Sequence, residues 1–435
     1  MGIKRTFIKN TSLNVISYIY LSVAAIISIP ILIHALGVQA FGLYTIITSI
    51  MPILSALDFG LGLAVIRYLA LPNVSDEKKA GVWQTSFYFF TFVGLALFFV
   101  VIAIFYLYVF KIPAINAIIG SNKLPIMFVV ALTMLVNHLN THFLTLPQAR
   151  HRFDIFSLNA FVSGTASTLI TAAVVLIKPD LLLVFITQLL GVSTTATILY
   201  FYAKGQFKQL NFPRFSLASF REIIGFGLKS FAGKVTSSLE ANGLNLIIAA
   251  YVSLKAVTYF SIPQSLIIKA AGGISMLTLS LFPLSTSLLT KESFPKLKKL
   301  MLWLQGAVVA GTFFGVAVIF FIGRPLLTLW LGNPDLVSNV YPLLQILSVQ
   351  LFFVALTPMP TAILESMNYP GTTSIFAFLT VFLEFIFLIF FLPRFGITGA
   401  AYALSLSAMV SVPLFLTVFL YRFRKYEKTL GPIIA

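Results

Sequence analysis

The hydrophobic positions of the chain fall into long continuous runs, and short polar or charged segments separate one run from the next. Most runs hold about 20 apolar residues, the length that an α-helix needs to cross a bilayer. The runs do not alternate between apolar and polar positions, as the strands of a membrane barrel do. The pattern therefore predicts an all-α polytopic membrane protein with twelve transmembrane helices, at residues 13–36, 42–69, 82–110, 124–148, 155–177, 180–203, 223–250, 257–289, 300–322, 338–366, 372–392 and 398–421.

The composition agrees with a membrane protein. Of 435 residues, 59% are hydrophobic and only 9% are charged, a balance that excludes a soluble globular fold. There is no cysteine, so a disulfide framework and a thiolate metal site are both excluded. The first span is too long for a cleavable signal peptide and lacks a small-residue cleavage site, so we expect it to remain as a helix.

The positive charge follows the predicted topology. With the N-terminus placed in the cytoplasm, 20 of the 29 Lys and Arg residues fall in cytoplasmic segments, six fall outside and three lie within spans. This bias predicts that both termini are cytoplasmic. The excess of basic residues therefore reflects orientation in a membrane, and we expect membrane lipids as partners and no nucleic acid.

The two halves of the chain resemble each other at a shift of 216 residues, which aligns residues 40–46 with 256–262 and Asp76 with Glu292. Each half holds six predicted spans, an even number, so the halves run parallel around an axis along the membrane normal. The sequence thus predicts two six-helix lobes around a central cavity, at 1–203 and 223–435, joined by a cytoplasmic linker at 204–222.

The span at 223–250 carries more charge than any other. Lys229, Lys234 and Glu240 lie among its apolar residues, and Lys269 lies in the next span. A charge that faces lipid is costly, so these side chains are expected to face protein or water. They indicate a cationic cavity suited to an anion, with Lys234 as the central residue, although fully paired structural charges remain an alternative.

The repeat makes the first span the counterpart of the charged one. At the shift of 216, Tyr18 aligns with Lys234 and Asn14 with Ser230, so both side chains are candidates for the lining of the same cavity. Tyr18 is suited to stacking on a sugar ring.

Two other spans carry polar groups near mid-membrane. Asp58 either caps a bend and fixes packing, or serves with Glu240 as a candidate ion-coupling site. His138 and His142 are one helical turn apart, but no Glu and no cysteine completes a zinc motif. A packing or hydrogen-bonding role is favoured for the two histidines, and sugar contacts or proton transfer remain open.

No motif for catalysis or for a cofactor appears. Residues 227–234 have one residue too many for a Walker A loop and follow no strand, which argues against nucleotide binding. No Ser-His-Asp set or metal cage is present, so we expect no enzyme activity.

A Gly42-Leu-Tyr44 segment is followed by Leu57-Asp-Phe-Gly-Leu-Gly62 and by Arg67 nine residues after the Asp. These motifs and the twelve-span layout resemble the polysaccharide transporter family, the Wzx-type O-antigen flippases of the multidrug/oligosaccharidyl-lipid/polysaccharide exporter superfamily. The resemblance implies a flippase that moves undecaprenyl-diphosphate-linked oligosaccharide across the bacterial inner membrane by alternating access. It also implies coupling to H⁺ or Na⁺ and partners in polysaccharide polymerisation.

Three alternatives follow from the same layout. A cation-coupled multidrug exporter would need an acidic cavity, which the lysines disfavour. A lipid II flippase is a second alternative, although those proteins have more than twelve helices. A non-transporting scaffold for polysaccharide synthesis is the third.

Overall fold

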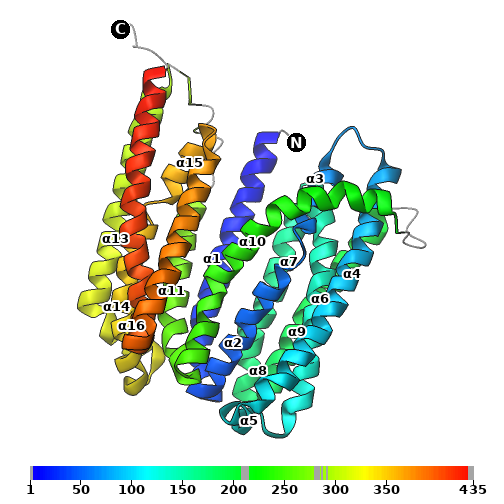
Figure 1. Cartoon of the computed structure of the whole chain (residues 1–435), viewed down its shortest axis with the longest axis vertical. Helices are drawn as coiled ribbons and strands as arrows, with labels where there is room; N and C mark the ends of the chain where they lie inside the picture. Colours follow the sequence, from blue (N-terminus) through cyan, green and yellow to red (C-terminus); the bar gives the residue numbers. More distant parts are fainter. Residues whose placement is uncertain (1–2, 207–214, 279–284, 286–287, 291, 430–435) are drawn as a thin grey trace. The chain divides into compact units, whose positions relative to one another are not determined.

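The computed structural model describes residues 3–206, 215–278, 285, 288–290 and 292–429; the side chains of residues 3–14, 229, 230, 232, 277 and 278 lie outside this description. Every regular element in the described residues is a helix, so the predicted all-α class is confirmed (Figure 1). The chain divides into two compact units, Met1–Ile247 and Ile248–Ala435. This division falls near the end of helix α10, whereas the predicted lobe boundary at the 204–222 linker stays a prediction.

The first unit is built from helices that follow one another through short turns. The elements are α1 (Ile3–Leu36), α2 (Val38–Ser55), α3 (Leu61–Ala70), α4 (Asp76–Leu107), η1 (Val109–Lys111), α5 (Pro113–Ile119), η2 (Gly120–Asn122), α6 (Lys123–Ala149), α7 (Phe153–Thr165), η3 (Ala166–Ile170), α8 (Thr171–Ile177), α9 (Leu181–Gln206) and α10 (Leu217–Tyr251).

The described part of the second unit is also built from helices. Its elements are α11 (Leu254–Thr278), α13 (Phe294–Leu331), α14 (Pro334–Val354), α15 (Pro358–Ser366) and α16 (Pro370–Thr429). Helix α16 contains a non-helical residue, Gly396, which separates the two predicted spans at 372–392 and 398–421. Helix α14 ends at Val354 and α15 begins at Pro358, so the predicted span at 338–366 is interrupted.

Within the described residues, nine helical stretches are long and apolar enough to cross a membrane. They establish a multi-pass membrane protein. Helices α10 and α11, which carry the lysines of the predicted cavity, are not among the nine, and α16 counts once although it contains two predicted spans. Twelve spans are consistent with these helices and stay a prediction. The end of the predicted 257–289 span lies mostly outside the described residues.

The two halves contain matching helix corners. His151 and Asn368 both have a positive φ, 56° and 65°, which is unusual for a residue other than glycine. At each corner the next backbone N–H, of Arg152 or Tyr369, donates to a carbonyl five residues earlier at 2.8 Å, the hydrogen bond of a Schellman helix end. The two corners are 217 residues apart, one more than the predicted shift of 216.

Helices α4 and α13 both begin after a serine, but Ser75 is extended and its hydroxyl accepts from the Lys78 N–H, whereas Ser293 is helical and makes no side-chain cap. The carbonyl of Ser75 accepts from Lys79, and that of Ser293 accepts from Leu297, at 3.0 and 3.2 Å. These serines are 218 residues apart. The alignment of Asp76 with Glu292 therefore stays a prediction.

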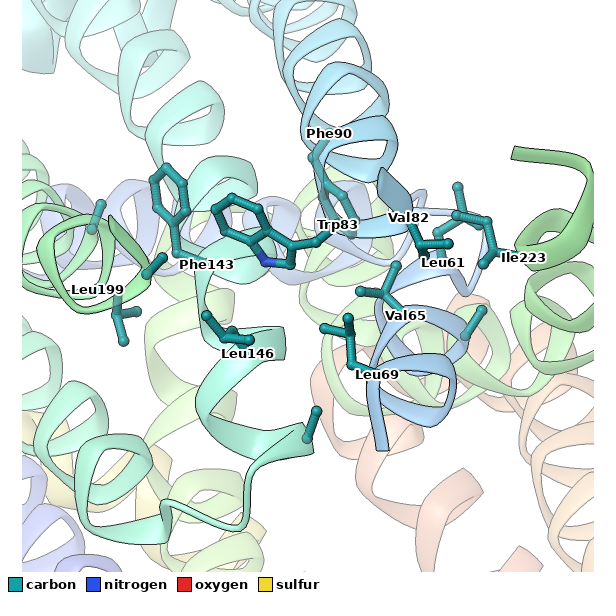
Figure 2. Packing of buried hydrophobic residues seen from close by; sticks show 14 residues of the cluster. Leu61, Val65, Leu69, Val82, Trp83, Phe90, Phe143, Leu146, Leu199 and Ile223 are labelled. Carbon is teal, nitrogen blue, oxygen red and sulfur yellow. The ribbon is translucent and has the colours of Figure 1, made fainter. Parts of the chain in front are cut away.

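The packed interior of the first unit explains why α10 belongs to it. Ile223, near the start of α10, is 2% exposed and lies in one cluster with Leu61 of α3 and Trp83 of α4 (Figure 2). Burying side chains of this size contributes about 1.5–3 kcal/mol each relative to leaving them in water. Side chains from α6 and α9 complete the cluster: Phe143, Leu146 and Leu199.

Candidate functional site

The chain leaves the helical conformation between α2 and α3, from Ala56 to Gly60. The predicted continuous helix at 42–69 is therefore wrong. Phe59 has φ 53° and Gly60 has φ 69°, both in the left-handed region. Asp58 stabilises this turn because its Oδ1 accepts a hydrogen bond from the Gly60 N–H at 3.0 Å.

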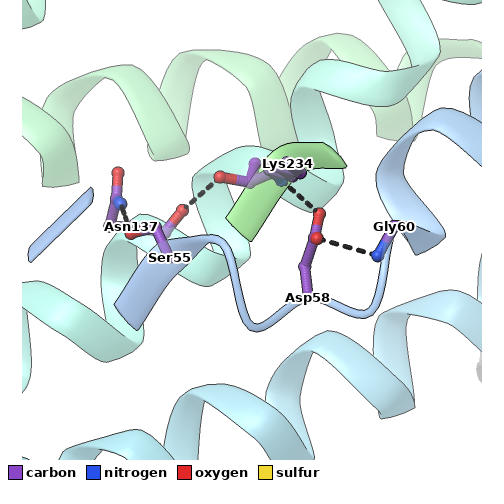
Figure 3. Close-up of polar contacts among 6 residues, drawn as sticks. Ser55, Asp58, Gly60, Asn137 and Lys234 are labelled. Carbon is purple, nitrogen blue, oxygen red and sulfur yellow. Dashed lines mark hydrogen bonds and ion pairs between the residues drawn. The ribbon is translucent and has the colours of Figure 1, made fainter. Parts of the chain in front are cut away.

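Asp58 is also half of an ion pair with helix α10. Lys234 Nζ donates to Asp58 Oδ2 at 2.7 Å (Figure 3). The Asp58 side chain is 2% exposed, whereas that of Lys234 is 38% exposed. One carboxylate therefore has both oxygens engaged, and its cationic partner remains accessible from outside the protein.

Glycine makes this close approach possible. A Cβ added at Gly227 of α10 would lie 2.7 Å from the Phe59 carbonyl oxygen, and 3.3 Å from the backbone of Gly60 and Leu61. A Cβ at Gly62 would lie 3.2 Å from Asp58 Oδ2. Gly227 therefore excludes a larger side chain, and a side chain at Gly62 would have to displace Asp58 Oδ2 by a few tenths of an ångström. Helix α10 thus packs directly on the backbone of the turn.

Aromatic rings cover the same turn. Phe59 stacks on Phe231 of α10 with ring centroids 5.0 Å apart, and it meets Phe89 of α4 edge-on at 6.1 Å. Such pairs add about 0.5–1.5 kcal/mol beyond the burial of apolar surface. They fix Phe59 in its left-handed conformation beside the ion pair.

Contacts nearer the ends of α10 hold the helix in register. Asn245 donates to Ser49 Oγ at 3.0 Å, deep in the unit. Near the other end, Arg67 lies over the ring of Phe226, 4.5 Å from its centroid. Arg67 thus packs on α10.

A surface ion pair adds to this register. Glu222 pairs with Lys78 at 3.2 Å. A hydrogen bond from Tyr68, and then the Lys78 ammonium, hold the pKa of the Glu222 carboxyl below its usual range. Because Glu222 is exposed, the contribution to stability is small.

The two histidines of α6 are packed inside the first unit. His138, 2% exposed, has Nδ1 3.2 Å from the Met134 carbonyl, to which it must donate. His142 is fully buried, and its Nδ1 lies 3.2 Å from Ser86 Oγ. The ring centroids of His142 and Trp83 are 4.5 Å apart. This agrees with the favoured packing role. A sugar contact would require rearrangement and stays a prediction.

His138 is nonetheless close to the ion pair. It interacts electrostatically with both Asp58 and Lys234, and no described residue bonds its Nε2. The preceding residue, Asn137, donates to Ser55 Oγ at 3.0 Å, at the end of α2 (Figure 3). Polar groups of α6 therefore border the turn that carries Asp58.

The remaining predicted site residues are distributed over α1, α10 and α11, in both units. Glu240 is exposed on α10, and Tyr18 is half-buried on α1. The side chains of Asn14 and Lys229 lie outside the described residues. Lys269 is half-buried in the second unit, so its joining Lys234 in one cavity stays a prediction. No group of three metal-ligating side chains occurs in the described part of the chain.

Comparison with known proteins decides the family. Residues 7–289 match the family described as "Polysaccharide biosynthesis protein". The chain belongs to this family. A Shigella flexneri protein named "Putative O-antigen transporter" is 20% identical over 415 residues, which cover 93% of this chain and 96% of that protein. The resemblance to polysaccharide transporters is thereby confirmed.

Solved structures give the fold of this polysaccharide biosynthesis family protein. An inward-facing multidrug resistance MATE family transporter of the MOP superfamily has a TM-score of 0.74 at 14% identity, over 95% of this chain and 99% of that one. The lipid II flippase MurJ in an inward closed conformation has a TM-score of 0.72 at 15% identity, over 95% and 89%. The fold is therefore the one that these two structures share.

Proposed function

We propose that the protein is a flippase for undecaprenyl-diphosphate-linked oligosaccharide repeat units in O-antigen or capsule synthesis. Membership of the polysaccharide biosynthesis family and the O-antigen transporter relative support this function. The bacterial inner membrane is the proposed location, with both termini in the cytoplasm because the basic residues are biased to that side. A polysaccharide polymerase is the proposed partner that consumes the translocated unit.

The ion pair between Lys234 and Asp58 is the observation that carries the site. An accessible ammonium is suited to a diphosphate, which it attracts as a point charge without demanding one orientation. Its buried counter-ion keeps it neutralised when no substrate is bound. A charge without a partner is costly in such surroundings. An anion that displaces Asp58 from Lys234 must therefore itself neutralise the Lys234 ammonium.

Exchange of partners is therefore the proposed first step. The diphosphate replaces Asp58 as the ion-pair partner of the Lys234 ammonium. Asp58 Oδ1 continues to accept its hydrogen bond from the Gly60 N–H. Release of Asp58 gives it a free oxygen that can take up H⁺ or Na⁺, which links the coupling ion to substrate occupancy. Lys229 and Lys269 are proposed to join the site during alternating access, and Glu240 is a second candidate for the ion.

Reconstitution into vesicles tests the function. Purified protein should move a fluorescent lipid-linked oligosaccharide across the bilayer, scored by its accessibility to an added glycosidase. Lys234→Gln should slow this movement about tenfold, the loss of one charge-assisted contact of about 1.4 kcal/mol. Lys78→Gln removes another paired lysine, outside the site, and should leave the rate unchanged. No movement by the wild-type protein would reject the flippase, and equal rates for the two variants would reject the role of Lys234.

A multidrug exporter is the competing function within the superfamily. Organic cations need an uncompensated carboxylate, and Asp58 is already paired with Lys234. The MATE likeness concerns fold alone at 14% identity. Uptake of a cationic dye into the same vesicles, with no movement of the oligosaccharide, would favour the exporter.

A further inference from the structure

His138, in the middle of helix α6, is a buried titratable residue to which the exchange of partners assigns no role. The residue is 2% exposed. Its Nδ1 lies 3.2 Å from the Met134 carbonyl oxygen, which can only accept a hydrogen bond, so Nδ1 carries a proton. A buried charge without a partner is costly, so the ring is neutral and its lone pair is on Nε2. No described residue bonds Nε2, and His138 therefore offers a base inside the first unit.

This base lies beside the ion pair. Phe90 of α4 is fully buried, and its ring centroid is 6.5 Å from that of His138. A Cβ added at Gly62 would lie 3.9 Å from Phe90 Cζ and 3.2 Å from Asp58 Oδ2, so Phe90 borders both groups. Asp58 and Lys234 both act electrostatically on His138. The imidazole is thus close enough to respond to a change in either charge.

Asp58 and Lys234 are the charged groups that face His138 from the elements around it. On helices α3, α4, α6, α7 and α9, the Asp, Glu, Lys and Arg residues lie in the first or last turn, and α2 and α5 carry none. Titratable but uncharged, His142 lies one turn along α6 and Tyr44 lies on α2. The charge balance at His138 is therefore set by the ion pair.

The exchange of partners upsets this balance. While Lys234 is bound to Asp58 at 2.7 Å, the two charges compensate each other beside a neutral ring. Once a diphosphate draws the ammonium away, the Asp58 carboxylate is left with the hydrogen bond from the Gly60 N–H. Its side chain is 2% exposed, and a buried carboxylate without a counter-charge is costly. A cation must replace Lys234, and His138 becomes one by binding a single proton.

We propose that His138 takes up a proton when the diphosphate binds. A hydrogen ion from water binds the lone pair of Nε2, the neutral ring gains one positive charge, and the ring compensates Asp58 in place of Lys234. Asp58 itself stays ionised. When the diphosphate leaves, Lys234 returns to Asp58 and Nε2 releases the proton. This inference rests on the proposed function, and it names H⁺ as the coupling ion and His138 as the residue that binds it.

Proton uptake on ligand binding tests this assignment with the purified full chain in detergent. Farnesyl diphosphate, a short polyprenyl diphosphate, is added to weakly buffered protein at about pH 8, where a free imidazole is neutral, and an indicator dye follows the change in pH. His138→Asn removes Nε2 but keeps an N–H at the place of Nδ1 for the Met134 carbonyl. His34→Asn is the matched control, because His34 Nδ1 lies 2.8 Å from the carbonyl four residues earlier, that of Pro30, but its ring is exposed.

The wild type should take up about one proton for each diphosphate bound, and so should His34→Asn. His138→Asn should take up none and should bind about tenfold more weakly, because the freed Asp58 then has no counter-charge. Between about pH 7.5 and about pH 9, the wild-type affinity should fall about tenfold per pH unit, the slope of one linked proton. His138→Asn should lose this slope, which a residue that serves packing alone would not change.

Proton uptake that persists in His138→Asn would overturn the assignment and place the proton on another group. Binding by the wild type without proton uptake would also overturn it, whether or not the variant folds, and melting temperatures show whether it does. Both of these outcomes leave the proposed flippase intact. A wild type that neither binds the diphosphate nor moves oligosaccharide in vesicles would reject the flippase and this inference together.

Discussion

Gly227→Ala is the sharpest perturbation of the contact between α10 and the Asp58 turn. The added Cβ would lie 2.7 Å from the Phe59 carbonyl oxygen and 3.3 Å from atoms of Gly60 and Leu61. All of these are backbone atoms, which have no rotamer into which to move. The helix and the turn must therefore separate.

The required separation sets the magnitude. Ordinary contact begins at 3.4 Å, so the distance to the Phe59 oxygen must grow by about 0.7 Å. Overpacking of this kind costs about 1–3 kcal/mol. Lys234 lies two helical turns further along α10, so the same displacement should lengthen its 2.7 Å contact with Asp58.

Gly233→Ala is the matched control on the same helix. A Cβ at Gly233 meets nothing within 4 Å. Both substitutions gain about 0.8–1 kcal/mol of helix propensity, so the difference between them isolates the overpacking.

Thermal unfolding in detergent and oligosaccharide movement in vesicles measure the two effects. Gly227→Ala should melt below Gly233→Ala and transport more slowly than it. Equal melting temperatures and equal transport would refute the close packing of α10 on the turn.

Two further predictions concern other parts of the chain. Gly399→Ala would place a Cβ against the Phe391 carbonyl, beside the Gly396 break, and should lower the free energy of unfolding by about 1–3 kcal/mol or more. Gly371→Ala, with open space around it, should not, and thermal unfolding in detergent compares the two. For Glu222, the lowered carboxyl pKa means that its small stabilisation is present above the unfolded pKa of about 4.3 and is lost as pH falls through the folded pKa. On lowering the pH from neutral to about 4, the Glu222→Gln variant should therefore lose less stability than the wild type. About 1 M salt should abolish this difference by screening the ion pair. A difference that persists in salt would contradict an electrostatic origin.

Much of the architecture could be predicted because membrane-spanning helices need long apolar runs, and such runs are visible in a single sequence. The break at Asp58 could not be read from those runs, since its residues are as apolar as the helices around them. The signal was local: Asp58 followed by Gly60 is a turn sequence, and the left-handed Phe59 needs packing from α4 and α10 to be stable.

The site was predicted residue by residue but not as a pair. Asp58 and Lys234 are 176 positions apart, and each was interpreted separately: Asp58 as the cap of a bend or an ion-coupling site, and Lys234 as a substrate-binding residue or a paired structural charge. Gly227 was considered only within a false nucleotide motif. Its real constraint is the backbone of another helix, and only the folded chain brings the two together.

The exchange of Lys234 between Asp58 and a diphosphate is the central claim, and binding of a short polyprenyl diphosphate tests it most directly. Asp58→Asn keeps an oxygen for the Gly60 N–H but removes the competing charge, so affinity should rise about tenfold; Lys234→Gln should lower it about tenfold. Glu222→Gln frees a different lysine, Lys78, and should change nothing. If Asp58→Asn weakens binding as Lys234→Gln does, Asp58 does not compete with the diphosphate and the exchange is wrong.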